Sequence, residues 1–130
     1  DMVAATNAML TRRDRAPMPL AALRPHVSKG SRAMLGAAFP ELEPETRNGM
    51  VQEFLDAYEA ELGRHGAPFA GVEPMLAALE ADGVRWGIVT NKPEYLAVQL
   101  MPMLGWRERC AVLIGGEAPL DERHLERLAL

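Results

Sequence analysis

The stretch Val84-Arg85-Trp86-Gly87-Ile88-Val89-Thr90-Asn91-Lys92-Pro93 decides the fold of this chain. It begins after Gly83 as an apolar run rich in β-branched and aromatic residues, a composition typical of a buried strand. The run ends in a hydroxyl, an amide, an ammonium group and a proline. Pro93 cannot donate to a strand ladder, but its fixed φ suits the start of a helix, and residues 94–100 have helical composition. The stretch therefore predicts a strand, a polar loop and a helix.

The polar loop of this stretch is suited to bind an anion. A helix N-terminus presents unpaired backbone N–H groups and a positive partial charge, and ligands of open α/β sheets gather at the carboxyl ends of parallel strands. Thr90 offers a hydroxyl, Asn91 a backbone N–H and an amide, and Lys92 a positive charge. We expect these three residues to bind phosphate. The alternative is that Thr90 and Asn91 only cap the next helix, and spacing alone does not decide between the two.

Composition limits the classes of protein to consider. The chain has 130 residues, 48% hydrophobic and 25% charged, enough for one modest core. Its net charge is -4, and basic residues are interspersed with acidic ones, so no nucleic-acid partner is expected. One cysteine, Cys110, excludes an internal disulfide, and the histidines lack metal-ligand spacing. Without an apolar run of about 18 residues or a signal peptide, a cytoplasmic protein with no membrane partner is expected.

The first half of the chain predicts helices throughout, with Asp1 placed to cap the first and Pro25 limiting the second. The last of them is the longest, because four large apolar residues recur four apart in one stripe. The expected helices are residues 1–13, 20–26, 33–39 and 45–65. The stripe consists of Met50, Phe54, Tyr58 and Leu62. Because the chain starts with Asp1 and runs at once into a helix, we expect it to begin inside a longer protein.

A second polar stretch, Val27-Ser28-Lys29-Gly30-Ser31-Arg32, precedes the helix expected over residues 33–39. Lys29 and Arg32, together with the free N–H groups of a helix start, could grip an anion. The alternative is a glycine-containing turn with two solvated cations. The stretch is not a phosphate-binding P-loop, because the pattern G-x-x-x-x-G-K-[ST] is absent.

The composition changes at Gly66-Ala67-Pro68-Phe69-Ala70-Gly71, where we expect a domain boundary. Beyond it helices and strands alternate, which implies parallel strands joined by right-handed crossovers. The expected elements are a helix over 72–82, a strand over 84–90, a helix over 93–104 that bends at Pro102, and a strand over 111–115. Two domains are predicted: a helical domain, residues 1–66, and an α/β domain, residues 67–130.

The string Gly87-Ile88-Val89-Thr90-Asn91-Lys92-Pro93, set between two helices, resembles the second motif of haloacid dehalogenase (HAD)-type phosphatases, most closely the phosphoglycolate phosphatase branch. Members of that family have a Rossmann-like α/β core and a helical cap inserted after the first core strand. The resemblance implies that residues 1–66 are the inserted cap domain and residues 67–130 a partial core with parallel strands. Pro68-Phe69-Ala70-Gly71-Val72 would be the return hinge.

The resemblance also implies a phosphatase that hydrolyses phosphomonoesters. Family members use an aspartate nucleophile, a second aspartate two residues later as acid and base, and Mg²⁺ as cofactor. In this plan Thr90 and Asn91 supply a hydroxyl and a backbone N–H to the phosphate. The nucleophile motif D-x-D-G-T occurs nowhere in the chain and is expected before Asp1. The chain alone is therefore expected to be inactive.

The last residues depart from the family pattern. A third-motif lysine should follow Gly115-Gly116 in an E-R-K-P pattern, but the sequence reads Asp121-Glu122-Arg123-His124-Leu125, with His124 at the lysine position. The acidic fourth motif would lie beyond Leu130. We expect the acidic residues of this tail to be solvated rather than to bind a metal. They are Glu117, Asp121 and Glu122. The departure suggests truncation, an altered reading frame or divergence.

The resemblance implies that the cap domain determines which substrate is bound. The segment 27–34 is similar to the cap segment of phosphatases that act on N-acetylmuramic acid 6-phosphate. That ester and 2-phosphoglycolate both carry a carboxylate, which could pair with Lys29 or Arg32. The sequence therefore does not tell which of the two esters is the substrate.

Two rival hypotheses stay open at this point. One is a non-catalytic protein of the same fold that binds anions or a partner, and the other is a purely helical interaction module whose last third is unstructured. Under the leading hypothesis, loss of the first core strand would leave a sheet edge unpaired, which favours association or domain exchange between copies of the chain, as a homodimer or an aggregate.

Overall fold

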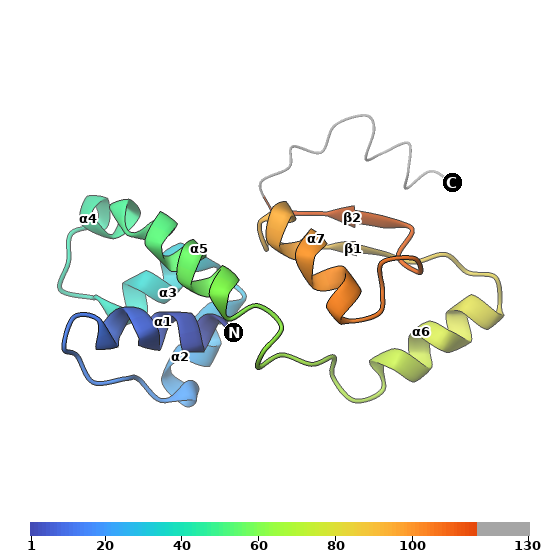
Figure 1. The fold of residues 1–130 in the computed structure, drawn as a ribbon, viewed down its shortest axis with the longest axis horizontal. Coiled ribbons are helices and arrows are strands. Elements are labelled where there is room, and N and C mark those ends of the chain that lie inside the picture. The colour runs from blue at the N-terminus through green and yellow to red at the C-terminus, as the bar shows by residue number, and fades with distance from the viewer. Residues whose placement is uncertain (117–130) are drawn as a thin grey trace. The chain divides into compact units, whose positions relative to one another are not determined.

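The structure is a computed structural model, and it describes residues 1–116 of the chain. The chain forms two compact units, one spanning Asp1–His65 and the other beginning at Gly66 (Figure 1). No helix among the described residues is long and apolar enough to cross a membrane.

The first unit is helical and holds its own core. Its elements, blue to green in Figure 1, are α1 (Met2–Thr11), α2 (Leu20–Val27), α3 (Ser31–Ala38), α4 (Pro44–Gly49) and α5 (Val51–Ala60). Helix α1 lies against α2, α3 and α5, which explains why large side chains from several helices are fully buried together. They are Met9, Leu10, Leu23, Met34, Leu35, Phe39 and Phe54. The predicted stripe of the last helix faces this core, because Met50, Phe54, Tyr58 and Leu62 are all buried.

The single helix predicted over residues 45–65 is wrong, because the chain is interrupted near Gly49. Helix α4 ends there, and Met50 donates its N–H to the carbonyl oxygen of Arg47 at 3.0 Å, a tighter turn than an α-helix makes. Glycine weakens a helix interior because it loses more backbone freedom on folding than other residues. The C-terminal end is also earlier than predicted, since Gly63 has a φ of 74° and turns the chain.

Asp1 does not cap α1 with its side chain as predicted, although it occupies the N-cap position. Its carboxylate instead accepts two backbone N–H groups from the segment that follows α5. Gly63 donates to Oδ2 at 2.8 Å and His65 donates to Oδ1 at 2.8 Å. The start of the first unit is therefore tied to its end.

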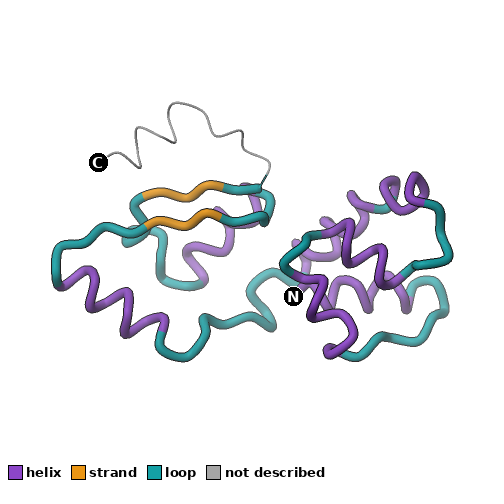
Figure 2. The backbone as a smooth tube through the Cα atoms, turned by 180° about the vertical axis from the view of Figure 1, so that it is seen from behind, coloured by secondary structure: helices purple, strands orange, loops and turns teal. Residues whose placement is uncertain are grey.

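The second unit contains α6 (Val72–Ala81), β1 (Gly87–Val89), α7 (Glu94–Met103) and β2 (Val112–Ile114). Among the described residues, the strands form a two-stranded parallel sheet, drawn in orange in Figure 2. Gly87 pairs with Val112 and Val89 with Ile114. The parallel pairing confirms the predicted α/β class. It also makes the purely helical alternative wrong.

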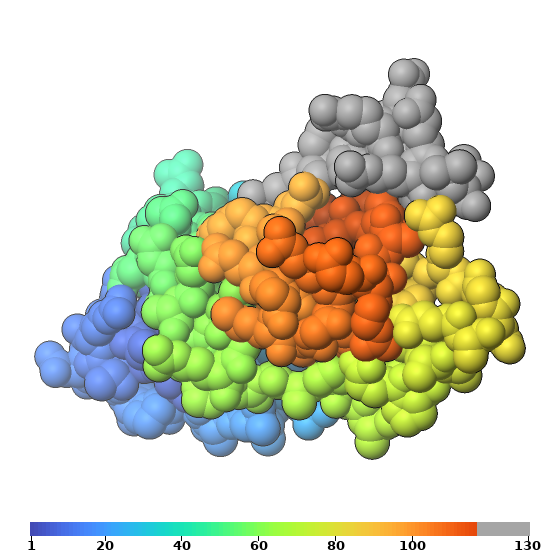
Figure 3. Space-filling view, turned by 45° about the vertical axis from the view of Figure 1, so that its right-hand side comes forward, coloured from blue at the N-terminus to red at the C-terminus, as the bar shows by residue number. Residues whose placement is uncertain are grey.

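Helix α7 covers β2, while β1 is more exposed than predicted. Leu96 and Met101 of α7 are buried, as are Val112 and Ile114 of β2, and the orange atoms of α7 lie against the red-orange atoms of β2 in Figure 3. In β1, by contrast, Val89 is 73% exposed. The prediction of a buried strand is therefore wrong for these residues, because β1 has a strand partner on one edge only among residues 1–116.

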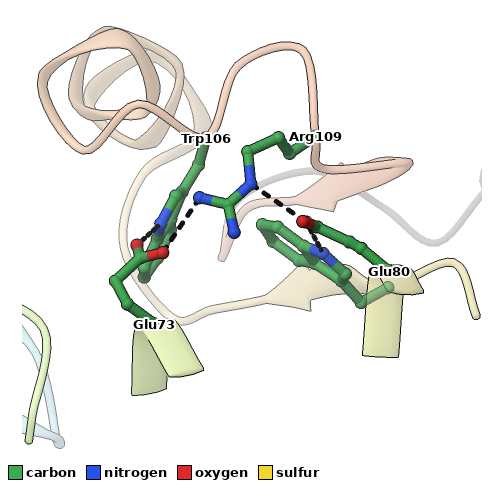
Figure 4. Close-up of polar contacts among 5 residues, drawn as sticks. Glu73, Glu80, Trp106 and Arg109 are labelled. Carbon is green, nitrogen blue, oxygen red and sulfur yellow. Dashed lines mark hydrogen bonds and ion pairs between the residues drawn. The ribbon is translucent and has the colours of Figure 1, made fainter. Parts of the chain in front are cut away.

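A polar cluster joins α6 to the rest of the second unit (Figure 4). Glu73 and Glu80 lie seven residues apart and thus on one face of the helix. Arg109 bridges them, with Nη1 donating to Glu73 Oε2 at 2.9 Å and Nε donating to Glu80 Oε1 at 2.9 Å. The indole N–H of Trp106 also donates to Glu73, and that of Trp86 donates to Glu80 at 2.8 Å. The two indole rings meet edge to face with centroids 5.8 Å apart.

Candidate phosphate-binding loop

Thr90, Asn91 and Lys92 form the loop between β1 and α7, where the sequence predicted an anion site. The N–H of Thr90 donates to the carbonyl oxygen of Ile114 at 2.9 Å, so pairing with β2 continues to the first residue of the loop. Thr90 Oγ1 then accepts the N–H of Lys92 at 3.1 Å. Because the hydroxyl oxygen accepts within the loop, its proton is directed away from that bond and can be donated to a ligand. The threonine is thereby oriented by the backbone around it.

Neither Thr90 nor Asn91 occupies the N-cap position of α7. The N-cap residue is Pro93, with a φ of -49° and a ψ of 134°, and it makes no side-chain cap hydrogen bond. Pro93 thus stands just before the first helical residue rather than at it. Both Leu96 and Ala97 donate their N–H groups to the carbonyl oxygen of Pro93, which places the loop directly before the first turn. That is where the N–H groups and the dipole of a helix favour an anion.

Lys92 brings a partly desolvated charge to the loop. Its side chain is half-buried, and burial lowers the pKa of its ammonium group from 10.5 to about 8. An anion close to this group would offset the cost of desolvation and raise the pKa again. Asn91, in contrast, is exposed. The loop therefore combines a fixed hydroxyl, an accessible amide and a cation that gains from an anionic neighbour.

The end of β2 lies against this loop, a contact that was not predicted from the sequence. Gly116 donates its N–H to the carbonyl oxygen of Lys92 at 2.8 Å, and Gly115 donates to Glu94 Oε2 at 3.4 Å. In the sequence this glycine pair marked only the point after which the third motif was expected. A glycine pair directly after a predicted parallel strand could have signalled the close approach.

The predicted cap residues Lys29 and Arg32 lie in the first unit, on either side of Gly30 and Ser31. Both side chains are exposed, and Gly30 has a φ of 84° at the N-cap of α3. This arrangement agrees with the glycine-containing turn and leaves both cations accessible to a ligand. Their role toward a substrate remains a prediction.

The acidic, histidine and cysteine side chains of the described residues do not gather into a group of metal ligands. Within residues 1–116, no group of three His, Cys, Asp or Glu side chains comes together that could hold a metal ion. The carboxylate of Asp1 accepts the backbone N–H groups of Gly63 and His65. Several residues discussed from the sequence lie outside the described part of the chain. They are Glu117, Asp121, Glu122 and His124.

Comparison with known proteins places this chain in a family. Residues 1–122 match the family of haloacid dehalogenase-like hydrolases. The chain is 55% identical over its full 130 residues to a phosphoglycolate phosphatase of Xylella fastidiosa (strain 9a5c), and covers 56% of that protein. It is 40% identical over 120 residues to an N-acetylmuramic acid 6-phosphate phosphatase of Pseudomonas aeruginosa, covering 88% of this chain and 51% of that protein.

The fold also matches a solved structure. A crystal structure of a predicted phosphoglycolate phosphatase from Haemophilus somnus superimposes with a TM-score of 0.78 at 18% identity, over 93% of this chain and 57% of that one. The chain spans about half the length of the curated relatives that it matches. Its parallel strands, the polar loop at the end of β1 and the family match over residues 1–122 agree, and the chain belongs to the haloacid dehalogenase-like hydrolases, with a partial Rossmann-like core.

Proposed function

We propose that this protein is a magnesium-dependent phosphomonoesterase of the phosphoglycolate phosphatase-like group. The observation that carries the proposal is the position of Thr90, oriented at the carboxyl end of β1 and directly before α7. Similarity to a phosphoglycolate phosphatase, at 55% identity over the 130 residues of this chain and 56% of that protein, supports the same activity. In this proposal residues 1–66 are the cap domain and residues 67–130 are part of the core.

Each loop residue has a distinct task in the proposal. The Thr90 hydroxyl and the Asn91 backbone N–H donate to the phosphoryl oxygens, and the Lys92 ammonium group balances their charge. Donors that are already oriented cost little reorganisation when negative charge develops in the transition state, which is why such groups accelerate phosphoryl transfer. The nucleophilic aspartate and Mg²⁺ belong to the expectation from the family, and residues 1–116 supply neither a D-x-D-G-T motif nor a metal site.

The proposed substrate is a small phosphate ester that carries a carboxylate. Relatives named for phosphoglycolate and for N-acetylmuramic acid 6-phosphate both match the chain, and both esters contain that group. Lys29 and Arg32 are exposed cations on a helical unit and are the proposed partners of the carboxylate. A cytoplasmic location completes the proposal, and a homodimer is proposed only for the 130-residue chain by itself, whose sheet would lack the first core strand.

The experiment is phosphate release by the complete gene product, with and without Mg²⁺, from 2-phosphoglycolate and N-acetylmuramic acid 6-phosphate in parallel. The proposal expects Mg²⁺-dependent release from at least one ester and none from the 130-residue chain alone. If the complete product is folded but releases phosphate from neither ester, the proposal is wrong. The alternative hypothesis, a non-catalytic anion-binding or interaction protein, is then favoured. The gene upstream of Asp1 distinguishes the two hypotheses before any assay: a D-x-D-G-T motif there favours the phosphatase, and its absence favours the non-catalytic protein.

A further inference from the structure

The loop 90–93 and the end of β2 are interlocked by backbone hydrogen bonds. Thr90 donates its N–H to the carbonyl oxygen of Ile114 at 2.9 Å. Two residues further along both segments the loop is the acceptor, because Gly116 donates its N–H to the carbonyl oxygen of Lys92 at 2.8 Å. The N–H of Lys92 is turned back to Thr90 Oγ1 and is therefore not available to the neighbouring strand. Both backbone groups of Lys92 are therefore held. Its N–H is bound by the Thr90 hydroxyl oxygen, and its carbonyl oxygen is bound by the N–H of Gly116.

This arrangement leaves no room for a side chain at Gly116. A Cβ atom there would lie 2.3 Å from the carbonyl oxygen of Asn91 and 2.9 Å from its Cα, which are backbone atoms and cannot rotate away. At Gly115 a Cβ would lie 2.4 Å from the Cα of Glu94. Neither glycine has a φ in the left-handed region, so glycine is needed at both positions for space rather than for backbone conformation.

The contact fixes the peptide groups on which the loop depends. The carbonyl of Asn91 and the N–H of Lys92 belong to one peptide plane, and this plane is held between Gly116 on one side and Thr90 Oγ1 on the other. Moving it would turn the hydroxyl of Thr90 and the backbone to which the Lys92 side chain is attached. We propose that Gly116 is a positioning residue, which holds Thr90 and Lys92 in the geometry that receives a phosphoryl group. This inference rests on the proposed function of the loop.

The main test compares Gly116→Ala with a matched control, Gly36→Ala. Gly36 lies in α3 with nothing near its Cβ position and no positive φ, so alanine fits there. Inorganic phosphate is titrated into the ¹⁵N-labelled protein while the amide signals of Thr90 and Asn91 are followed, and hydrogen exchange is measured at the Lys92 amide. We expect Gly116→Ala to weaken phosphate binding by about tenfold or more and to lose protection at Lys92. Gly36→Ala should do neither.

A second pair of variants covers the case in which Gly116→Ala fails to fold. Glu94→Gln and Glu94→Ala both remove the charge of Glu94, but only glutamine keeps an oxygen that can accept the Gly115 N–H. Because Gly115 directly precedes Gly116, loss of its hydrogen bond to Glu94 would let Gly116 shift away from Lys92, so we expect Glu94→Gln to bind phosphate a few-fold more tightly than Glu94→Ala. Equal affinities in this pair would overturn it.

The outcomes separate the inference from the function on which it rests. If the wild-type protein binds phosphate and Gly116→Ala binds it equally well, the positioning role is overturned and the phosphate site stands. If phosphate does not shift the Thr90 and Asn91 signals even in the wild-type protein, the proposed site fails and the positioning role fails with it.

Discussion

The carboxylate of Asp1 accepts the backbone N–H of His65 at 2.8 Å, so the first and last residues of the helical unit are joined directly. The other oxygen of the same carboxylate accepts the N–H of Gly63 at 2.8 Å. The chain therefore enters and leaves this unit at one point. A unit whose two ends lie together can be inserted into another domain without disturbing its fold, which supports the proposal that it is a cap.

Removing this carboxylate should destabilise the helical unit. Asp1→Ala leaves two backbone donors without their charged acceptor, and we expect the free energy of unfolding of that unit to fall by about 1–3 kcal/mol. Asp1→Asn keeps an oxygen for one donor and should lose less. Helix unfolding is followed by circular dichroism in urea. Tryptophan fluorescence is an internal control that should stay unchanged, because Trp86 and Trp106 both lie in the second unit. Equal stability of Asp1→Ala and wild type would contradict this role.

The contact of α6 with Arg109 should weaken in acid. The hydrogen bond from Trp106 and then that from Arg109 hold the pKa of Glu73 below its usual value, and Arg109 followed by Trp86 does the same for Glu80. A carboxylate with a lowered folded-state pKa contributes stability above its unfolded pKa and loses it as the pH falls through the folded value. Stability of the second unit should therefore decline below about pH 5.

Arg109→Met tests this assignment, since it removes the bridge between Glu73 and Glu80. The variant should be less stable than wild type at neutral pH and should show a shallower decline in acid, measured by tryptophan fluorescence in urea. Arg107→Met is the matched control, because Arg107 is exposed and only approaches its neighbour Glu108 at 3.9 Å. Parallel stability curves for Arg109→Met and wild type across this range would refute the assignment.

Anion binding should follow the protonation of Lys92. Burial lowers the pKa of this group to about 8, so its charge is present below that pH and is lost above it. Sulfate is the suitable probe, because its own charge does not change in this range. We expect sulfate affinity to fall several-fold between about pH 7 and about pH 9.5. Lys92→Arg should bind sulfate without this dependence, since arginine stays charged. A wild-type affinity that is constant over the same range would exclude Lys92 from the site.

The proposed carboxylate partners should affect substrate binding selectively. Lys29→Ala or Arg32→Ala is expected to raise KM for 2-phosphoglycolate about tenfold, because a charge-assisted hydrogen bond is lost. Ethyl phosphate lacks the carboxylate, and its KM should not change. Arg24→Ala provides a control at another exposed cation of the same unit. If neither variant raises KM or lowers kcat/KM for 2-phosphoglycolate, the hypothesis is wrong.

Local patterns predicted much of the fold. The strand, loop and helix around Thr90 and the apolar stripe through Phe54 follow from residue types and spacing over a few turns, and the structure contains both. The interruption at Gly49 was missed because residues 45–49, which lie before the first stripe residue Met50, were joined to the helix without any apolar periodicity of their own. A periodic pattern shows which face is buried but does not show whether the backbone is continuous.

Contacts between distant residues could not be predicted in the same way. Asp1 and His65, Glu73 and Arg109, and Lys92 and Gly116 are each far apart in the sequence, and their pairing depends on the finished fold. The low burial of β1 was missed for a related reason, because the number of strands that flank it is not encoded in its own residues. The candidate site residues Thr90, Asn91 and Lys92 could be proposed from the sequence because their chemistry is concentrated in one loop.

Steady-state kinetics of Thr90→Val in the complete gene product test the central claim most directly. Valine has nearly the shape of threonine but cannot donate to a phosphoryl oxygen, and Thr90→Ser, which keeps the hydroxyl, is the matched control. We predict that Thr90→Val lowers kcat/KM for the preferred ester by about 10- to 100-fold and that Thr90→Ser retains most of it. An unchanged kcat/KM in a folded Thr90→Val variant would remove Thr90 from the site and contradict the account.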